Sequence, residues 1–82
     1  MIVTIDTVWE VVGSLADGSE VKMAAVHSEE RIIGRLIDFG NGVYRADYID
    51  VEGEVQETLS DDLYTAVQAI TDEALARAKV LN

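Results

Sequence analysis

The sequence predicts an α+β fold of two ββα units (ββαββα), with a four-stranded antiparallel sheet and both helices on one of its faces. The first observation behind this prediction is the long apolar stripe with helical spacing that follows Ser60. The second is a pair of acid–glycine dipeptides, Asp17-Gly18 and Glu52-Gly53, each flanked by runs rich in β-branched residues, as expected of hairpin turns. The length of 82 residues corresponds to a single domain.

A correspondence between the two halves of the chain supports the same layout. A valine–aromatic dipeptide and an acid–glycine turn recur at the same separation, as Val8-Trp9 with Asp17-Gly18 and as Val43-Tyr44 with Glu52-Gly53. An acidic helix start follows each hairpin, Ser28-Glu29-Glu30 in the first half and Ser60-Asp61-Asp62 in the second. We therefore expect a pseudo-repeat of residues 1–40 and 41–82, each a hairpin followed by a helix.

The first hairpin begins with residues 2–15, which are rich in valine, isoleucine and threonine and predict a strand with a break near Asp6-Thr7. A helix over residues 7–15 is the alternative, because Thr7 and Glu10 have the spacing of a capping box. The strand is favoured because the Asp17-Gly18 turn and a second β-like run, residues 20–27, come next.

Residues 29–39 predict the first helix. Four apolar residues with helical spacing lie between the acidic start and Gly40, which stands where a glycine would end a helix: Ile32, Ile33, Leu36 and Ile37. Gly34 inside this helix would cost up to about 1 kcal/mol relative to alanine. The alternative is a third strand that runs through Phe39.

The second half starts at the Asn41-Gly42 turn and continues with strands over residues 43–50 and 55–59. Residues 61–80 then form the longest helix, with Ser60 as its N-cap residue. Val67 and Ile70 fall on the apolar stripe, so we expect both in the core, and Glu73 and Arg77 have the spacing of an i,i+4 ion pair.

Charge is the most unusual property of the composition. Sixteen acidic and six basic residues give a net charge of -10. Such a surface repels nucleic acid and anionic membranes and attracts basic protein surfaces. There is no cysteine, no signal-peptide pattern at the amino end and no long apolar segment, so we expect a cytoplasmic protein.

The acids are concentrated in residues 47–62, where no basic residue occurs. The residues expected to bind a partner are Asp47, Asp50, Glu52, Glu54, Glu57, Asp61 and Asp62. Such a cluster can imitate the phosphates of a nucleic acid and occupy a groove lined by arginine and lysine. The competing interpretation is a solvated hairpin edge that charge protects against edge-to-edge pairing.

The sequence contains no pattern for catalysis or for a cofactor. The acids around Gly53 lack the ligand alternation of an EF-hand, so no metal is expected. His27 is the one histidine, and neither a cysteine nor a serine in a nucleophile elbow could partner it. We therefore expect a protein that is not an enzyme. Trp9 and Tyr44 are core residues on this interpretation, and would be interface anchors if exposed.

The small size, the acidity, the lack of cysteine and the α+β layout of the whole chain resemble the inhibitors that bacteriophages encode, anti-CRISPR proteins in particular. This resemblance rests on no shared motif. It implies a protein that binds a nucleic-acid-handling protein in the host-cell cytoplasm, in some cases by mimicking DNA, and that performs no chemistry.

Residues 44–75 also resemble the ribonuclease-H-like module of HicB-type antitoxins, with Gly53, Thr58-Leu59 and Ala66 at corresponding places. This second resemblance implies a protein-interaction module that works through apolar contacts and a homodimer. The leading expectation from the sequence is thus an acidic inhibitor, and the alternative is a dimerising module.

Overall fold

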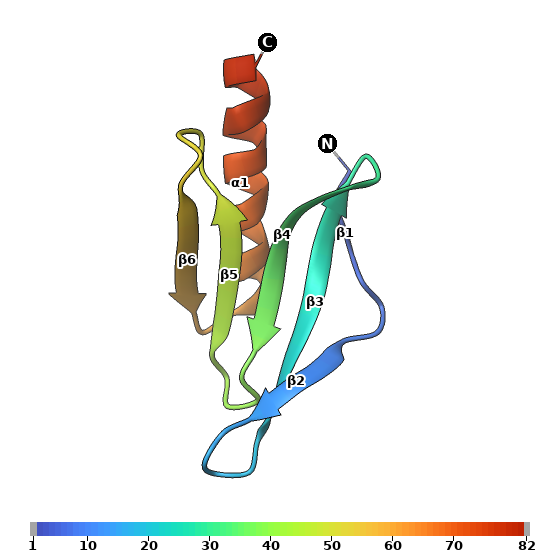
Figure 1. Cartoon of the computed structure of the whole chain (residues 1–82), viewed down its shortest axis with the longest axis vertical. Helices are drawn as coiled ribbons and strands as arrows, with labels where there is room; N and C mark the ends of the chain where they lie inside the picture. Colours follow the sequence, from blue (N-terminus) through green and yellow to red (C-terminus); the bar gives the residue numbers. More distant parts are fainter. Residues whose placement is uncertain (1, 82) are drawn as a thin grey trace.

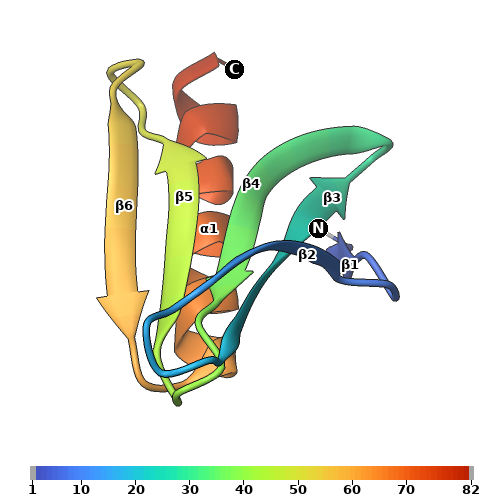
Figure 2. The same cartoon turned by 60° about the horizontal axis from the view of Figure 1, so that its bottom comes forward.

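The computed structural model describes residues 2–81, which form a six-stranded antiparallel sheet and one helix. In chain order the elements are β1 (Thr4–Ile5), β2 (Glu10–Ser14), β3 (Glu20–Ser28), β4 (Arg31–Asp38), β5 (Tyr44–Ile49), β6 (Val55–Ser60) and α1 (Leu63–Leu81). The strand order is β1-β3-β4-β5-β6, and β2 pairs with β3 beyond the end of β1 (Figure 1). Figure 2 shows α1 lying along one face of the sheet, where it contacts β4, β5 and β6.

The predicted helix over residues 29–39 is wrong, because this segment is strand β4 in the middle of the sheet. Its acidic start is a tight turn in which Glu29 and Glu30 both have positive φ, at 54° and 66°. The apolar spacing is similar to that of a helix because Leu36 and Ile37, although adjacent, are both buried, on opposite faces of the sheet, at 0% and 6% exposure. A central strand with apolar residues on both of its faces gives a continuous apolar run, which periodicity alone cannot distinguish from a helix.

The described part of the chain, residues 2–81, therefore contains no ββα repeat, and the predictions of a four-stranded sheet and of two helices on one face are both wrong. The first half of the chain contributes four strands, β1 to β4, and the second half contributes a hairpin and the helix. Gly40 does not end a helix. It has a φ of 75° in the β4–β5 turn, where Gly42 also has positive φ as the Asn41-Gly42 prediction requires. The broader α+β class is correct.

The amino-terminal predictions agree with the structure. Residues 2–15 form β1 and β2, interrupted near Asp6-Thr7 as expected, and both strands pair with β3. At the β2–β3 hairpin the Leu15 N–H donates to Ser19 O, and Gly18 has a φ of 90°. The capping-box helix over residues 7–15 does not form.

The carboxyl-terminal helix runs without a break through Ile70, as predicted, but it begins two residues later than residue 61. Its N-cap is Asp62 and not Ser60. The Asp62 carboxylate accepts bonds from the Thr65 N–H at 2.9 Å and from the Thr65 hydroxyl at 2.6 Å. These two bonds lower the pKa of Asp62, the one from the hydroxyl having the larger effect.

The core lies between α1 and the sheet. Its most buried members come from four elements: Val26, Leu36, Ala46, Ala66 and Ile70. Ile70 is fully buried, as predicted, whereas Val67 is only half-buried, so the prediction for Val67 is wrong. Trp9 and Tyr44 pack at the border of this core and are partly exposed.

Candidate functional site

The seven acids expected to bind a partner do not form one patch. Asp50, Glu52 and Glu54 lie at the β5–β6 turn, while Asp61 and Asp62 lie at the far end of β6, where the chain enters α1 (Figure 1). Strand β6 has six residues, so about 20 Å separates the two groups. Asp47 and Glu57 lie opposite each other in the middle of β5 and β6.

Asp47 is committed to ion pairs inside the protein. Its side chain is 7% exposed, and Arg45 grips both of its oxygens, Nε to Oδ1 at 2.8 Å and Nη2 to Oδ2 at 3.0 Å. Arg35 of β4 lies 3.5 Å from the same carboxylate, and Arg45 also reaches Glu57 at 3.2 Å. Hydrogen bonding to Asp47 is the main reason that the pKa of Arg45 is raised. The sheet thus pairs two acids of the run 47–62, Asp47 and Glu57, with arginines that lie outside that run.

Asp50 organises the β5–β6 turn. Its Oδ1 accepts the backbone N–H groups of Glu52 and Glu54, each at 2.9 Å, and its Oδ2 accepts Nε2 of Gln56 at 2.8 Å. These donors lower the pKa of Asp50, the bond from Glu54 having the largest effect. The Asp50 N–H also donates to Glu54 O, and Gly53 has a φ of 85° that few other residues adopt.

Helix α1 holds this turn from the other side. The Glu73 carboxylate accepts the Val51 N–H at 2.9 Å, and Arg77 Nη1 donates to Asp50 O at 2.8 Å and to Ile49 O at 3.4 Å. Glu73 and Arg77 therefore bind the turn separately and do not form the i,i+4 pair that their spacing predicts. Neither bond could be found from the sequence, because both depend on where α1 crosses β5.

Within residues 2–81, the side chains of three of the seven acids make no hydrogen bond or ion pair and are exposed, namely those of Glu52, Glu54 and Asp61. Glu57 is shared, since it contacts Arg45 but keeps 57% of its side chain exposed. Asp47, Asp50 and Asp62 instead support the fold. The part of the predicted site that is open to a partner thus consists of Glu52, Glu54, Glu57 and Asp61.

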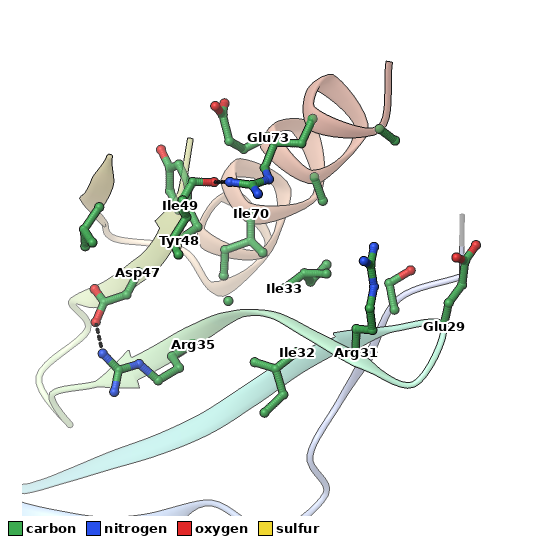
Figure 3. A pocket seen from close by; sticks show the side chains of 16 residues that line it. Glu29, Arg31, Ile32, Ile33, Arg35, Asp47, Tyr48, Ile49, Ile70 and Glu73 are labelled. Carbon is green, nitrogen blue, oxygen red and sulfur yellow. Dashed lines mark hydrogen bonds and ion pairs between the residues drawn. The ribbon is translucent and has the colours of Figure 1, made fainter. Parts of the chain in front are cut away.

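The structure also contains a hollow that the sequence did not indicate. It measures about 520 Å³ and lies between β4 and the second half of α1, with Tyr48 and Ile49 of β5 at its base. Figure 3 shows Ile33 and Ile70 pointing into it from opposite walls. Its lining contains three arginines and three carboxylates, Arg31, Arg35, Arg77, Glu29, Asp47 and Glu73. The hollow is therefore balanced in charge, unlike the chain as a whole.

His27 lies near the end of β3, as predicted, and its Nε2 is 2.8 Å from Asp6 Oδ1. Asp6 also accepts the Ala25 N–H, which is the main reason that its pKa is lowered. The pair joins the first residues of the chain to β3, and no serine or threonine oxygen hydrogen-bonds to it within the described residues. Over the same part of the chain no three His, Cys, Asp or Glu side chains are grouped to hold a metal ion.

Comparison with protein-family models, with curated proteins and with solved structures gives no match for this chain. Over residues 2–81, no helix combines the length and the apolarity that crossing a bilayer requires.

Proposed function

We propose that the protein is a non-enzymatic inhibitor that binds a basic surface of another protein through the β5–β6 hairpin. The observation that carries the proposal is the bracing of the turn: two helix side chains and the Asp50 carboxylate hold it, while Glu52 and Glu54 remain exposed. A turn fixed in this way loses little conformational freedom on binding, so more of the interaction energy contributes to affinity.

The distribution of the basic residues adds to this proposal. Of the six basic residues in the chain, Arg35 and Arg45 bind Asp47, and Arg77 binds backbone carbonyls of the turn. None of these three is directed at Glu52 or Glu54, so the tip of the hairpin stays negative. A negative tip on a chain of net charge -10 accelerates encounter with a basic partner, and the effect weakens as salt increases.

The resemblance to phage-encoded inhibitors suggests the kind of partner. A groove that binds nucleic acid is lined by arginine and lysine, and acids spaced along a hairpin can occupy it in place of phosphates. The protein would then act in the cytoplasm of a bacterial host, as anti-CRISPR proteins do. The proposal needs no cofactor and no direct contact with nucleic acid.

The test compares two double variants with the same change in net charge. Glu52→Gln with Glu54→Gln alters the tip of the hairpin, and Glu10→Gln with Glu20→Gln alters exposed acids near the opposite edge of the sheet. Immobilised protein would first isolate its partner from a bacterial lysate with elution by salt. Association rates with the purified partner would then be measured by biolayer interferometry at about 50 mM and 500 mM salt.

We expect the hairpin variant to associate about 3- to 10-fold more slowly at low salt and to depend less on salt, with the control variant close to wild type. Equal rates for the two variants would mean that the acids act only through net charge. Wild-type rates for the hairpin variant at both salt concentrations would reject the hairpin as the contact.

A second candidate function, a dimerising protein-interaction module, is favoured by the hollow between β4 and α1. Apolar side chains line it, its charges balance, and Ile32 at its margin is 66% exposed. Large exposed apolar residues around a concavity are common at protein interfaces. Sedimentation equilibrium of the wild type and of the Ile32→Ser variant tests this candidate. If the protein dimerises through this hollow, the wild type should form a dimer and the variant should dissociate. A wild-type protein that is monomeric at all concentrations would reject the candidate.

A further inference from the structure

Strand β6 is an open edge of the sheet. Among residues 2–81 it pairs only with β5, over all six of its residues and without a shift in register. Both Figure 1 and Figure 2 show it at the outer border of the sheet. The opposite border is divided between the two-residue β1 and the irregular β2, whose register shifts between Val11 and Gly13. Within residues 2–81, β6 is therefore the longest regular edge on which another strand could pair.

The free hydrogen-bonding groups of this edge can be assigned from the hairpin. In an antiparallel pair, opposed residues alternate between those that exchange hydrogen bonds and those that do not. The Asp50 N–H donates to Glu54 O, so the alternation places the backbone groups of Gln56, Thr58 and Ser60 toward β5. The N–H and C=O groups of the intervening residues then point away from the sheet: Val55, Glu57 and Leu59.

The side chains of these three residues share one face. Thr58 is opposite Ala46, which is buried beneath α1, so residues 55, 57 and 59 project from the face without the helix. Val55 is 70% exposed and Leu59 is 65% exposed, with the half-exposed Glu57 between them. The edge therefore presents an apolar, an acidic and an apolar side chain in succession, each beside a free backbone donor and acceptor.

The usual protections of an edge strand are missing from β6. It contains no proline, no lysine and no bulge, and its one charged residue is Glu57. Glu57 works against pairing with a second copy, because a symmetric pair centred on it would place two carboxylates opposite each other. A second copy would also bring another net charge of -10 to this edge. A basic segment meets neither obstacle.

We propose that β6 accepts an extended segment of the partner protein as an additional strand, with a lysine or arginine beside Glu57 and apolar residues beside Val55 and Leu59. This inference rests on the proposed function for the basic character of the partner, and it names the form in which that partner binds. Backbone hydrogen bonds supply affinity in such strand addition, and the alternate side chains supply specificity. Glu54 and Asp61, at either end of β6, add attraction for further basic residues.

The first test uses a synthetic peptide, acetyl-Thr-Val-Thr-Lys-Thr-Val-Thr-amide, whose valine, lysine and valine side chains share one face of a strand. In the free protein, the amides of Val55, Glu57 and Leu59 should exchange with solvent much faster than those of Gln56, Thr58 and Ser60. Saturating peptide should slow exchange at the three outward amides by about 10-fold or more, as measured by nuclear magnetic resonance.

Two control peptides sharpen this test. One carries N-methyl groups on the valine and lysine amides that would bond to β6, and the other has glutamate in place of lysine. Neither should protect the outward amides. Protection by the N-methylated peptide, no protection by the original peptide, or changes centred on the hollow between β4 and α1 would each overturn the inference.

The second test separates the edge from the acidic turn, using the partner isolated above. Val55→Pro removes one outward N–H at the first residue of the strand, a position where proline is tolerated, and a thermal melt checks that the variant folds. Glu57→Gln leaves the backbone intact and should weaken binding about 2- to 5-fold. If only the Glu52 and Glu54 variant reduces partner binding, the edge inference fails and the proposed function stands. If only the β6 variants do so, the edge stands and the proposed contact at the turn fails.

Discussion

Replacing Gly34 with alanine should destabilise the protein, because Ile70 of α1 packs directly against the backbone of Gly34. A Cβ atom at this position would lie 2.7 Å from Ile70 Cγ2, 2.9 Å from Ile70 Cδ1 and 2.9 Å from the backbone oxygen of Asp47. Ile70 is fully buried and cannot move aside, and the Asp47 oxygen belongs to the neighbouring strand. The added methyl group can be accommodated only by shifting the helix or the sheet.

The sign of this effect separates the structure from the sequence-based prediction. Overpacking a core costs about 1–3 kcal/mol, and the loss of glycine's freedom in the unfolded chain returns about 0.4–1 kcal/mol, so the free energy of unfolding should fall by up to about 2.6 kcal/mol. If residues 29–39 formed the predicted helix, Gly34→Ala would instead raise the free energy of unfolding, by up to about 1 kcal/mol.

Urea unfolding followed by circular dichroism measures the change, with Gly13→Ala as the matched control. A Cβ at Gly13, also a strand residue, would meet nothing within 4 Å, so this variant should be neutral or slightly stabilising. Ile70→Val removes Ile70 Cδ1, one of the two side-chain atoms that would clash with the new methyl group. In the Gly34→Ala background it should therefore lower the free energy of unfolding by less than the usual cost of this substitution, about 0.5–1.5 kcal/mol. A Gly34→Ala protein that is more stable than wild type would refute the close approach of α1 to β4.

The remaining predictions concern the core, the pH dependence and the turn. Ile70→Ala should cost about 2–5 kcal/mol in urea unfolding, and Val67→Ala should cost less because Val67 is only partly buried, at the border of the core; equal costs would contradict the packing of α1. The pKa of Asp50 in the folded protein lies below its ordinary value of 3.8, so the ionised Asp50 side chain stabilises the fold fully above pH 3.8 and loses this effect as the pH falls further. The difference in the free energy of unfolding between wild type and Asp50→Asn should therefore narrow below about pH 4. A difference that does not change with pH would contradict this role. Arg77→Ala should speed amide exchange across the β5–β6 turn, and unchanged exchange would mean that α1 does not brace it.

The second half of the fold could be predicted from the sequence because its signals are local and agree with one another. Asn41-Gly42 and Glu52-Gly53 mark the turns, and an uninterrupted stripe with helical spacing marks α1. The N-cap was placed two residues early because Ser60 and Asp62 are both good capping residues, and only the path of the chain out of β6 decides between them.

In the first half, the prediction for residues 29–39 is wrong because β4 is determined by the strands that flank it. A strand between β3 and β5, covered on one face by α1, has the same apolar content as a buried helix, and its length of eight residues does not distinguish the two. Gly34 was the residue that could have corrected the prediction. A glycine in a strand often marks a place where another element approaches closely, and here that element is α1.

Several acids of the run from residue 47 to 62 stabilise the fold, so only the others provide evidence for a function. Residues two apart in a strand share a face, so the pairing of Arg45 with Asp47 could have been expected from their spacing, although that of Arg35 needed the register of β4. The repulsion among seven acids is consequently smaller than the sequence suggests, because Asp47 and Glu57 face arginines, Asp50 accepts three donors and Asp62 caps the helix. The acids left without a structural reason are Glu52 and Glu54 at one end of β6 and Asp61 at the other. Each end of a strand added along β6 would therefore lie near one of these negative charges. The segment best suited to this edge carries basic residues at its two ends as well as at its centre.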